Sequence, residues 1–238
     1  MPGPFNFLLV GKSRVMSTAV PRAYDAAAVV IPAHNERAKL PACLRAVLTA
    51  ALCAPIPVTV VVVLDGCEDG SDELAGEYGP DVHFISVDVR NAGTARAVGF
   101  GYARSLLGDD TRTWFATADA GSRVDPRWLL DQLRSGADMV VGVMRCYEAG
   151  AHARQTQHEV VDGDMGFAAR AYWHVGGFHA GATGEKADLV ERFEAAGYHI
   201  HRDTDLSVIT SKRIQARDPY GFADYLTQLG RTAAGDCA

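Results

Sequence analysis

The chain has 238 residues, 48% of them hydrophobic and 22% charged, with a formal net charge of −6 at pH 7. This composition is ordinary for a soluble globular protein, and the negative balance argues against nucleic-acid binding. The five cysteines are odd in number and include no C-x-x-C pair. They argue against a disulfide framework or a zinc site and favour a reducing, cytoplasmic compartment. No apolar run approaches the roughly 20 residues that span a membrane, so we expect no transmembrane segment.

Strand-like and helix-like segments alternate along the first 143 residues. Continuous apolar runs and helical spacing predict strands at 26–31, 58–64, 82–87, 114–118 and 138–143, with helices between them at 38–53, 72–78, 91–107 and 126–133. Four such alternations are typical of a Rossmann-like α/β fold, with a mostly parallel sheet and helices on both faces.

The second half of the chain follows a different pattern. Residues 145–158 are polar and aperiodic, which predicts a loop or short helix able to cover a cleft. The sequence then contains glycine-rich segments at 163–167 and 176–178, a predicted helix at 188–197, one or two strands at 199–210 and a closing amphipathic helix at 222–229.

Four polar clusters stand beside the predicted strands, at 32–36, 65–71, 91–96 and 119–122. Because the carboxyl ends of parallel strands meet at one edge of a sheet, we expect these clusters to form a single ligand-binding cleft. Two acids have alternative interpretations. Asp119 could cap a following helix, and Asp65 could be a turn residue before Gly66.

Five motifs in this order resemble those of family 2 glycosyltransferases, which have the GT-A fold and use nucleotide-diphosphate sugars. They are the segments 29–36, 62–71 and 91–96, the strand end at Asp119, and Gly166-Phe167 with Tyr172, Gly176-Gly177-Phe178 and a helix led by Gly184-Glu185. The resemblance covers about residues 27–210. It implies a single GT-A type domain at 25–238 after an N-terminal arm at 1–24, with a nucleotide-binding half at about 26–122, an acceptor half at about 123–217 and a C-terminal helix and tail at 218–238.

The resemblance also implies roles for individual residues. The first-strand loop would contact the donor nucleoside through Pro32, His34, Asn35 and Glu36. Asp65 would accept a hydrogen bond from the base, with Arg96 beside it. Asp119 would open the D-x-D motif, which holds the ribose and, through its last acid, a divalent metal. Glu185 would begin the Glu-Asp pair whose second acid is the catalytic base, and most of the family inverts the anomeric centre by direct displacement.

General chemistry is consistent with these roles. A uracil-type edge carries an N–H group, which an ionised Asp65 can accept. A diphosphate leaving group needs cations or N–H donors, and a helix start such as Gly93 offers backbone N–H groups. For Arg96, the alternative is an ordinary surface position on a helix.

Two departures from the family pattern affect the predicted chemical centre. Gly121 replaces the last acid of D-x-D, and Lys186 replaces the second acid of the Glu-Asp pair. Mg²⁺ and Mn²⁺ prefer carboxylate oxygens, so an ion held by Asp119 and donor phosphates alone would be weakly fixed, and metal dependence is in question. A lysine ammonium beside a diphosphate is a poor base but a good electrostatic partner. The alternative is a solvent-facing lysine in the first helical turn.

Further candidates flank this centre. The acceptor proton would go to Glu185 first and Asp188 second, because Asp188, two residues after position 186, points away from it on a helix. Arg213 and Arg217 form a basic run where the family often covers the donor diphosphate, although such a run is usually a solvated face. His179 is the best placed of the histidines, directly after a Gly-Phe pair.

The motifs support two functions of different class. One is a cytoplasmic glycosyltransferase that moves a sugar from a nucleotide-diphosphate donor to a small-molecule or glycan acceptor, with inversion. The other is an impaired family member that binds nucleotide or nucleotide sugar as a sensor or partner subunit. Asp65, Arg96 and Asp119 favour nucleotide binding in both cases, whereas Gly121 and Lys186 favour the second. The motifs leave the donor sugar, the acceptor and the oligomeric state open.

Overall fold

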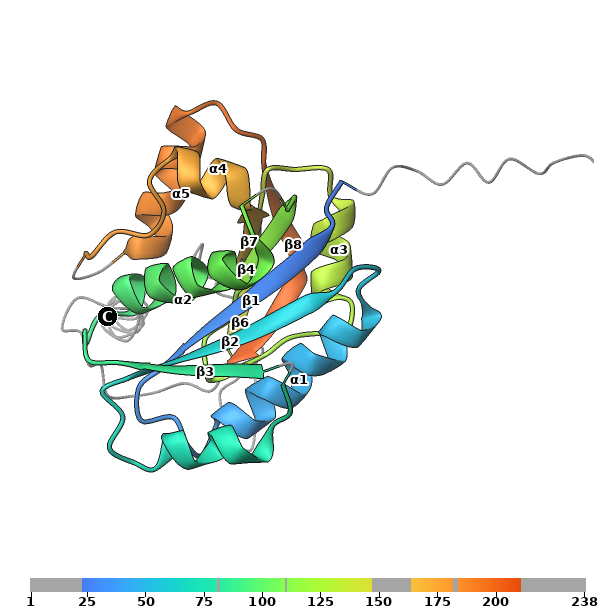
Figure 1. Ribbon diagram of the computed structural model, residues 1–238. Helices are drawn as coiled ribbons and strands as arrows, with labels where there is room; N and C mark the ends of the chain where they lie inside the picture. The colour runs from blue at the N-terminus through green and yellow to red at the C-terminus, as the bar shows by residue number, and fades with distance from the viewer. Residues whose placement is uncertain (1–22, 81, 110, 147–163, 182–183, 211–238) are drawn as a thin grey trace, which may run out of the picture.

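One eight-stranded sheet organises the part of the chain that the structure describes (Figure 1). The computed structural model describes residues 23–80, 82–109, 111–146, 164–181 and 184–210. The strand order across the sheet is β3-β2-β1-β4-β7-β6-β8-β5. The early strands β1 to β4 therefore occupy one side of the sheet and the later strands the other.

Four parallel strands form the first side, namely β1 (Ala26–Ala33), β2 (Val58–Asp65), β3 (Val82–Val87) and β4 (Thr113–Thr117). β1 and β4 are almost wholly buried because both faces of the sheet are covered, and this is why their sequences are continuous apolar runs. Alternate residues of β1 join opposite layers, with Val29 and Ile31 in one hydrophobic cluster and Ala28 and Val30 in the other. The four predicted strands are confirmed.

The second side of the sheet mixes strand directions. It contains β5 (Ser122–Arg123), β6 (Met139–Cys146), β7 (Met165–Ala168) and β8 (Ile200–Thr210). β6 and β8 are parallel, whereas β7 runs antiparallel between β4 and β6, and β5 is antiparallel to β8. The mostly parallel sheet is confirmed, and β7 lies in a segment that the sequence analysis described only as glycine-rich. Gly166 fits this strand because a Cβ there would lie 1.9 Å from Oε1 of Gln132 and 2.6 Å from Nε1 of Trp114.

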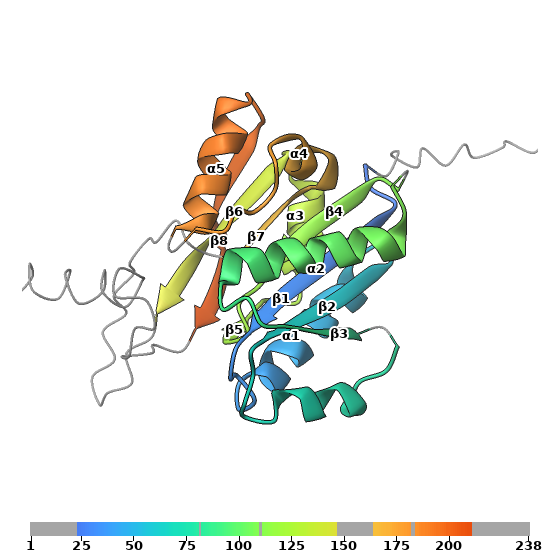
Figure 2. The same ribbon diagram turned by 60° about the vertical axis from the view of Figure 1, so that its left-hand side comes forward.

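Helices cover both faces of the sheet, as predicted (Figures 1 and 2). One face carries α1 (Leu40–Cys53) and α3 (Trp128–Arg134), and the other carries α2 (Ala92–Leu107), α4 (Ala169–His174) and α5 (Glu185–Ala195). A 3-10 helix, η1 (Ser71–Glu77), lies near β3. α5 begins at Glu185 rather than at Asp188, where the apolar spacing placed its start, so Glu185 and Lys186 are in its first turn.

Aromatic side chains fill the core between the sheet and the α2–α4 layer. Phe100, Phe115, Phe167 and Tyr172 are each at most 1% exposed. The ring centroids of Phe100 and Phe115 are 4.7 Å apart, and those of Phe167 and Tyr172 are 5.0 Å apart. Such pairs add about 0.5–1.5 kcal/mol beyond the burial of their area. The hydroxyl of Tyr172 accepts the N–H of Phe178 at 2.9 Å, which fixes the loop after α4 to the same core.

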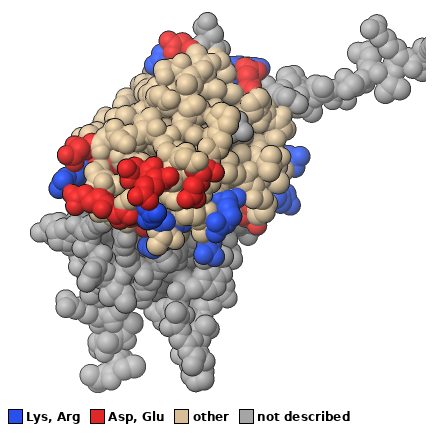
Figure 3. All heavy atoms as spheres, turned by 60° about the horizontal axis from the view of Figure 1, so that its bottom comes forward, with Lys and Arg blue, Asp and Glu red and all other residues tan. Residues whose placement is uncertain are grey.

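The described surface mixes acidic and basic side chains (Figure 3). At the bottom of Figure 1, η1 exposes Asp72, Glu73 and Glu77, and Arg37 pairs with Glu73 at 2.7 Å. Seen from that side, acidic side chains gather in a band with lysine and arginine side chains beside them. The described part of this face therefore carries charges of both signs.

Several predictions lie outside the described residues. They are most of the N-terminal arm (residues 1–22), most of the cleft-covering segment (147–158), the helix at 222–229, and the basic side chains of Arg213 and Arg217. Within the ranges that the structure describes, no helix is both long enough and apolar enough to cross a membrane.

Candidate active site

The loops that follow β1 and β2 lie against each other at the carboxyl edge of the sheet. Nδ1 of His34 donates to the carbonyl oxygen of Asp65, and Oδ1 of Asn35 accepts the N–H of Glu68 at 2.7 Å. These contacts join the predicted nucleoside loop to the predicted base-binding loop. The two polar clusters therefore meet at this edge, as expected, and their lining of one ligand-binding cleft stays a prediction.

The other two residues of the predicted nucleoside loop flank these contacts. Pro32 still belongs to β1 and pairs with Val63 of β2. Glu36 begins the turn into α1, and its Oε2 lies 3.6 Å from Nζ of Lys39. Both are partly exposed at the same edge. Their contact with a nucleoside stays a prediction.

Asp65 fastens a second loop to the end of β2. Asp65 is 5% exposed, and its carboxylate accepts hydrogen bonds from three backbone N–H groups. Oδ1 accepts from Val89 and Arg90, both at 2.8 Å, and Oδ2 accepts from Asn91 at 2.9 Å. The Asp65 side chain is therefore held by the loop after β3, and not by a local turn before Gly66, which was the alternative interpretation. Its predicted hydrogen bond to a base would come in addition to these three.

Arg96 connects the end of β4 to the start of α5. It is 3% exposed. Its Nη2 donates to Oδ1 of Asp119 at 2.6 Å, its Nη1 donates to Oε1 of Glu185, and its Nε donates to Oγ1 of Thr117 at 3.3 Å. The guanidinium also lies 5.6 Å from the ring centroid of Phe178.

The burial of Arg96 shows that the alternative, a surface position, is wrong, and its role beside Asp65 at the base stays a prediction. The guanidinium points to the end of β4 because a buried cation needs carboxylate partners. Burial lowers the pKa of Arg96, but the carboxylates of Asp119 and Glu185 outweigh this, and its pKa lies above the ordinary value. Arg96 is therefore positively charged and held in place by its two carboxylate partners.

Lys186 is buried against the same carboxylate. Its side chain is 4% exposed, and Nζ lies 3.2 Å from Oδ2 of Asp119. The alternative interpretation, a solvent-facing lysine, is therefore wrong.

The interpretation of Asp119 as a helix cap is also wrong, because α3 has Arg127 at its N-cap. We call Arg96, Asp119, Glu185 and Lys186 the central cluster.

Asp119 is the member of the central cluster with the most exposed side chain, at 38%. Burial acts to raise its pKa, but the charges of Lys186 and Arg96 outweigh burial and lower the pKa to about 2. The carboxylate is therefore ionised at neutral pH and reachable from solvent.

Glu185 and Asp188, the two candidate proton acceptors, are both ion-paired in the first turn of α5. Glu185 is bound to Arg96 and its side chain is 18% exposed. Asp188 accepts bonds from Arg192 at 2.7 and 3.1 Å, and its Oδ2 lies 3.4 Å from Nδ1 of His179. The bonds from Arg192 lower the pKa of Asp188. Asp188 thus pairs along its own helix rather than with Lys186, as the helical spacing predicted.

The start of α2 packs closely on the loop before α5. Oδ1 of Asn91 caps α2 by accepting the N–H of Thr94 at 2.8 Å, and its Nδ2 donates to the carbonyl oxygen of Gly181 at 2.6 Å. A Cβ on Gly93 would lie 2.5 Å from the carbonyl oxygen of His179, so glycine is needed for this approach. A hollow of about 250 Å³ opens beside the contact, lined by His179, Ala180, Gly181, Glu185 and Asp188.

Asp164 is a site residue that the sequence analysis missed. It is fully buried, and its Oδ1 accepts the N–H of Asp119 at 3.2 Å and the hydroxyl of Ser122 at 3.3 Å. It lies at the carboxyl edge because β7 is antiparallel and Met165 pairs with Thr117, the last residue of β4. An acid directly before a short apolar run is the signal that could have indicated it.

The environment of Asp164 favours its protonated form. Burial and then the charge of Asp119 raise the pKa of Asp164 to about 7, although the charge of Lys186 acts in the opposite direction. Its Oδ2 is buried and has no hydrogen-bond partner in the described structure. An isolated carboxylate oxygen in such a place is costly, and this is the physical reason for the raised pKa.

The described residues do not fit a divalent metal ion. Both oxygens of Asp119 are paired with cations, Oδ1 with Arg96 and Oδ2 with Lys186, and Gly121 supplies no carboxylate. Among the residues that the structure places, no group of three or more histidine, cysteine, aspartate or glutamate side chains could hold a metal. Mg²⁺ and Mn²⁺ need several oxygen ligands, whereas both carboxylate oxygens of Asp119 already pair with cations of the protein itself.

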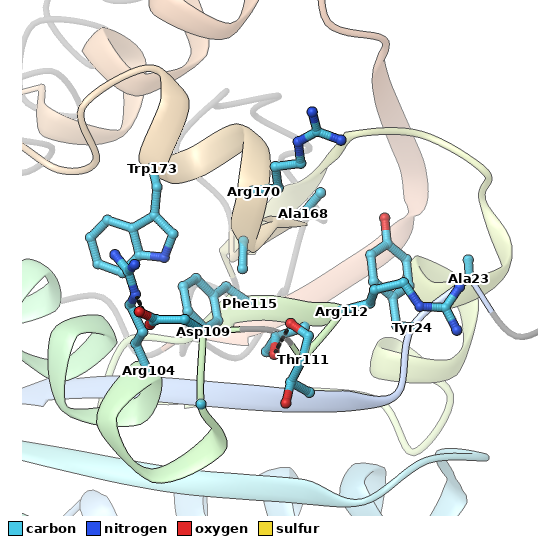
Figure 4. A pocket seen from close by; sticks show the side chains of 13 residues that line it. Ala23, Tyr24, Arg104, Asp109, Thr111, Arg112, Phe115, Ala168, Arg170 and Trp173 are labelled. Carbon is cyan, nitrogen blue, oxygen red and sulfur yellow. Dashed lines mark hydrogen bonds and ion pairs between the residues drawn. The ribbon is translucent and has the colours of Figure 1, made fainter.

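A larger hollow of about 540 Å³ lies at the opposite end of β4 (Figure 4). Arg104 lies 5.1 Å from the ring centroid of Trp173 and bonds to Asp109 at 2.5 Å, and Arg112 bonds to Asp25 at 2.9 Å. These two arginines already have carboxylate partners. Ligands of open α/β sheets bind at the carboxyl ends of the strands, so we place the site at the central cluster.

The sequence profile described as "Glycosyl transferase family 2" matches residues 28–193. The chain belongs to glycosyl transferase family 2. This family member is 30% identical over 158 residues to the "Undecaprenyl-phosphate 4-deoxy-4-formamido-L-arabinose transferase" of Yersinia enterocolitica, a match that covers 60% of the chain and 47% of the relative. The chain thus spans about half the length of the curated relatives it matches.

Solved structures share the fold of this family 2 member. S. aureus TarS 1–349 in complex with UDP-GlcNAc has a TM-score of 0.60 at 13% identity and covers 83% of this chain and 61% of its own. The mannosyltransferase PcManGT from Pyrobaculum calidifontis, with GDP-Man and Mn²⁺, has a TM-score of 0.57 at 14% identity and covers 80% and 57%. The predicted GT-A type α/β fold is confirmed.

Proposed function

We propose that this family 2 member is a glycosyltransferase that moves a sugar from a nucleotide-diphosphate donor to an acceptor, with inversion at the anomeric carbon. The proposal rests on the central cluster, where the accessible carboxylate of Asp119 is held between Arg96 and Lys186 at the carboxyl edge of the sheet. The donors named in two structural relatives, UDP-GlcNAc and GDP-Man, support this donor class. The name of the curated relatives supports the reaction class.

The donor would lie along the carboxyl edge of the sheet. The loops after β1 and β2, with Asp65, would take the nucleoside. The ammonium of Lys186 would take the diphosphate, and its charge would offset the charge that grows on the leaving group as the bond to the sugar breaks. Arg213 and Arg217 are proposed further contacts of the diphosphate.

The chemical step would be a direct displacement. An acceptor oxygen forms a bond to the anomeric carbon while the bond to the diphosphate breaks, and the nucleotide leaves with the electron pair. For a hydroxyl acceptor the proton would pass to Glu185, which lines the 250 Å³ hollow, with Asp188 as the second candidate. An ionised phosphate acceptor, such as the undecaprenyl phosphate named in the curated relatives, would need no base.

The second candidate function is nucleotide binding without transfer. The ion pair between Lys186 and Asp119 favours it, because the position of the family's base carries a cation instead. A sensor or partner subunit would keep the nucleotide loops and need neither a base nor a metal.

The two functions can be separated with the full chain. UDP-GlcNAc and GDP-Man are each mixed with the protein and with water, a glycan mixture or undecaprenyl phosphate as acceptor, and nucleotide release and binding are measured. A transferase should release nucleotide, and Asp119→Asn should slow release by roughly 100-fold because a fixed charge of the site is removed. Binding without release in every combination would favour the sensor, and absence of binding would overturn both functions.

A further inference from the structure

One oxygen of Asp164 bridges the two sides of the turn that contains Gly121. Oδ1 accepts the backbone N–H of Asp119 at 3.2 Å and the hydroxyl of Ser122 at 3.3 Å. The turn itself is closed by the N–H of Ser122, which donates to the carbonyl oxygen of Asp119 at 2.8 Å. The carboxyl group of Asp164 thus lies over the segment in which the D-x-D acid is missing.

We propose that Asp164 is a positioning residue for the donor: it holds the Asp119–Ser122 turn so that the carboxylate of Asp119 stays between Arg96 and Lys186. The inference rests on the proposed function, since it assigns a purpose to the geometry of the same site. Asp164 comes from the start of β7, 45 residues along the chain. It therefore ties the turn after β4 to a neighbouring strand.

The Asp119–Ser122 turn needs a contact from another part of the chain because its own residues make few stabilising contacts. Gly121 has no side chain to pack or to hydrogen-bond. The carboxylate of Asp119 must nevertheless be aimed accurately, with Oδ1 at 2.6 Å from Nη2 of Arg96 and Oδ2 at 3.2 Å from Nζ of Lys186. A shift of the backbone at Asp119 would break both ion pairs and move the cations with which a diphosphate would pair.

A second buried polar side chain provides a matched control. Gln132 is 1% exposed and Asp164 is 0% exposed, and each has one buried polar atom without a hydrogen-bond partner in the described structure, Nε2 and Oδ2 respectively. Oε1 of Gln132 accepts Nε1–H of Trp114 at 2.9 Å in the core below the sheet. Truncating either residue removes buried hydrogen bonds, but only Asp164 contacts the Asp119–Ser122 turn.

The test compares Asp164→Ala, Asp164→Asn and Gln132→Ala with the wild type in the full chain. Hydrogen exchange of the amides from 119 to 122 is measured without ligand, and the affinities for UDP-GlcNAc and GDP-Man are measured by calorimetry. Asp164→Ala should speed exchange at Asp119 and weaken nucleotide-sugar binding roughly tenfold, because a backbone N–H loses its acceptor. Asp164→Asn should restore both, since its amide oxygen can accept the same two bonds. Gln132→Ala should leave both unchanged.

Each result bears on the proposal in a defined way. Unchanged exchange at Asp119 in Asp164→Ala would overturn it, whether or not a nucleotide sugar binds. Equal losses of affinity in Asp164→Ala and Gln132→Ala would also overturn it, because the effect would then follow general destabilisation. If neither nucleotide sugar binds the wild type while exchange changes as expected, the positioning of the turn stands and it is the proposed function that fails.

Discussion

The ammonium of Lys186 lies 3.2 Å from Oδ2 of Asp119, across 67 residues of sequence. The other oxygen of the same carboxylate lies 2.6 Å from Nη2 of Arg96. Each oxygen of Asp119 therefore has its own cation, and both cations belong to the protein. Neither oxygen is therefore left unpaired, whereas a divalent metal needs carboxylate oxygens as ligands.

The first prediction is that nucleotide diphosphates bind without a metal. UDP affinity should be the same in EDTA and in excess Mn²⁺, because the charge that a metal would supply is already present in Lys186. Lys186→Met should weaken UDP binding by roughly 1.5–3 kcal/mol, the range of one charge-assisted hydrogen bond. Calorimetry measures the UDP affinity of the wild type and of Lys186→Met, each in EDTA and in excess Mn²⁺.

The control for this experiment is Arg104→Met, which removes a cation from the far end of α2 where it pairs with Asp109. It should leave UDP affinity unchanged. Binding by the wild type that requires Mn²⁺, or a Lys186→Met protein with full affinity, would contradict the prediction.

The second prediction is that Lys186→Asp creates metal dependence. The substitution removes the ammonium and adds a carboxylate beside Asp119 and near Asp164. Carboxylates crowded together repel one another unless a divalent ion joins them, so Mn²⁺ should now raise the melting temperature and EDTA should lower it. Lys186→Asn, which removes the charge without adding an acid, should respond less. A Lys186→Asp protein whose melting temperature does not change with Mn²⁺ would show that the cluster cannot form a metal site even with an acid at position 186.

The sequence predicted the sheet and named all four members of the central cluster, but it did not predict which of them contact one another. Strand runs such as β2 are recognisable because burial on both faces demands continuous apolar residues. The pairing of Lys186 with Asp119 depends on how α5 meets β4, which no local pattern contains. Asp164 was missed because β7 has four residues, too few for a period, and because its antiparallel direction brings the start of the strand to the site. The ion pairs of Arg96 with Asp119 and Glu185 depend in the same way on how α2 meets β4 and α5.

The third prediction concerns the two tasks of Asp65. Asp65→Ala should lower the free energy of unfolding by about 1–3 kcal/mol because three backbone N–H groups lose their acceptor, and it should also weaken UDP binding. The control is Asp69→Ala in the same loop, whose carboxylate accepts from the backbone of Arg37 and from Ser71. Urea unfolding and calorimetry should show lost stability in both variants but lost UDP affinity in Asp65→Ala alone. Equal loss of UDP affinity in the two would mean that Asp65 holds the loop and makes no contact with a base.

The last prediction is that Asp164 makes the protein less stable as the pH rises. The pKa of Asp164 is about 7 in the folded chain and 3.8 in the reference state, so between these values the folded state binds more protons than the unfolded state. The free energy of unfolding must then fall as the pH rises through this window. The asparagine side chain in Asp164→Asn cannot ionise, so the free energy of unfolding of this variant should lack the decrease that Asp164 causes. It should match the wild type near pH 4 and exceed it at pH 8 by roughly 2–4 kcal/mol, since each pKa unit corresponds to about 1.4 kcal/mol.

Asp119 contributes to the pH dependence with the opposite sign. Its pKa is lowered to about 2, so the stability that it contributes is present above its reference value and is lost as the pH falls towards 2. That loss is common to the wild type and to Asp164→Asn, so comparing the two proteins isolates Asp164. Urea unfolding at intervals from pH 4 to pH 8 measures the difference. A constant difference across this range would mean that Asp164 is ionised throughout, with a partner for Oδ2 that holds its charge at every pH tested.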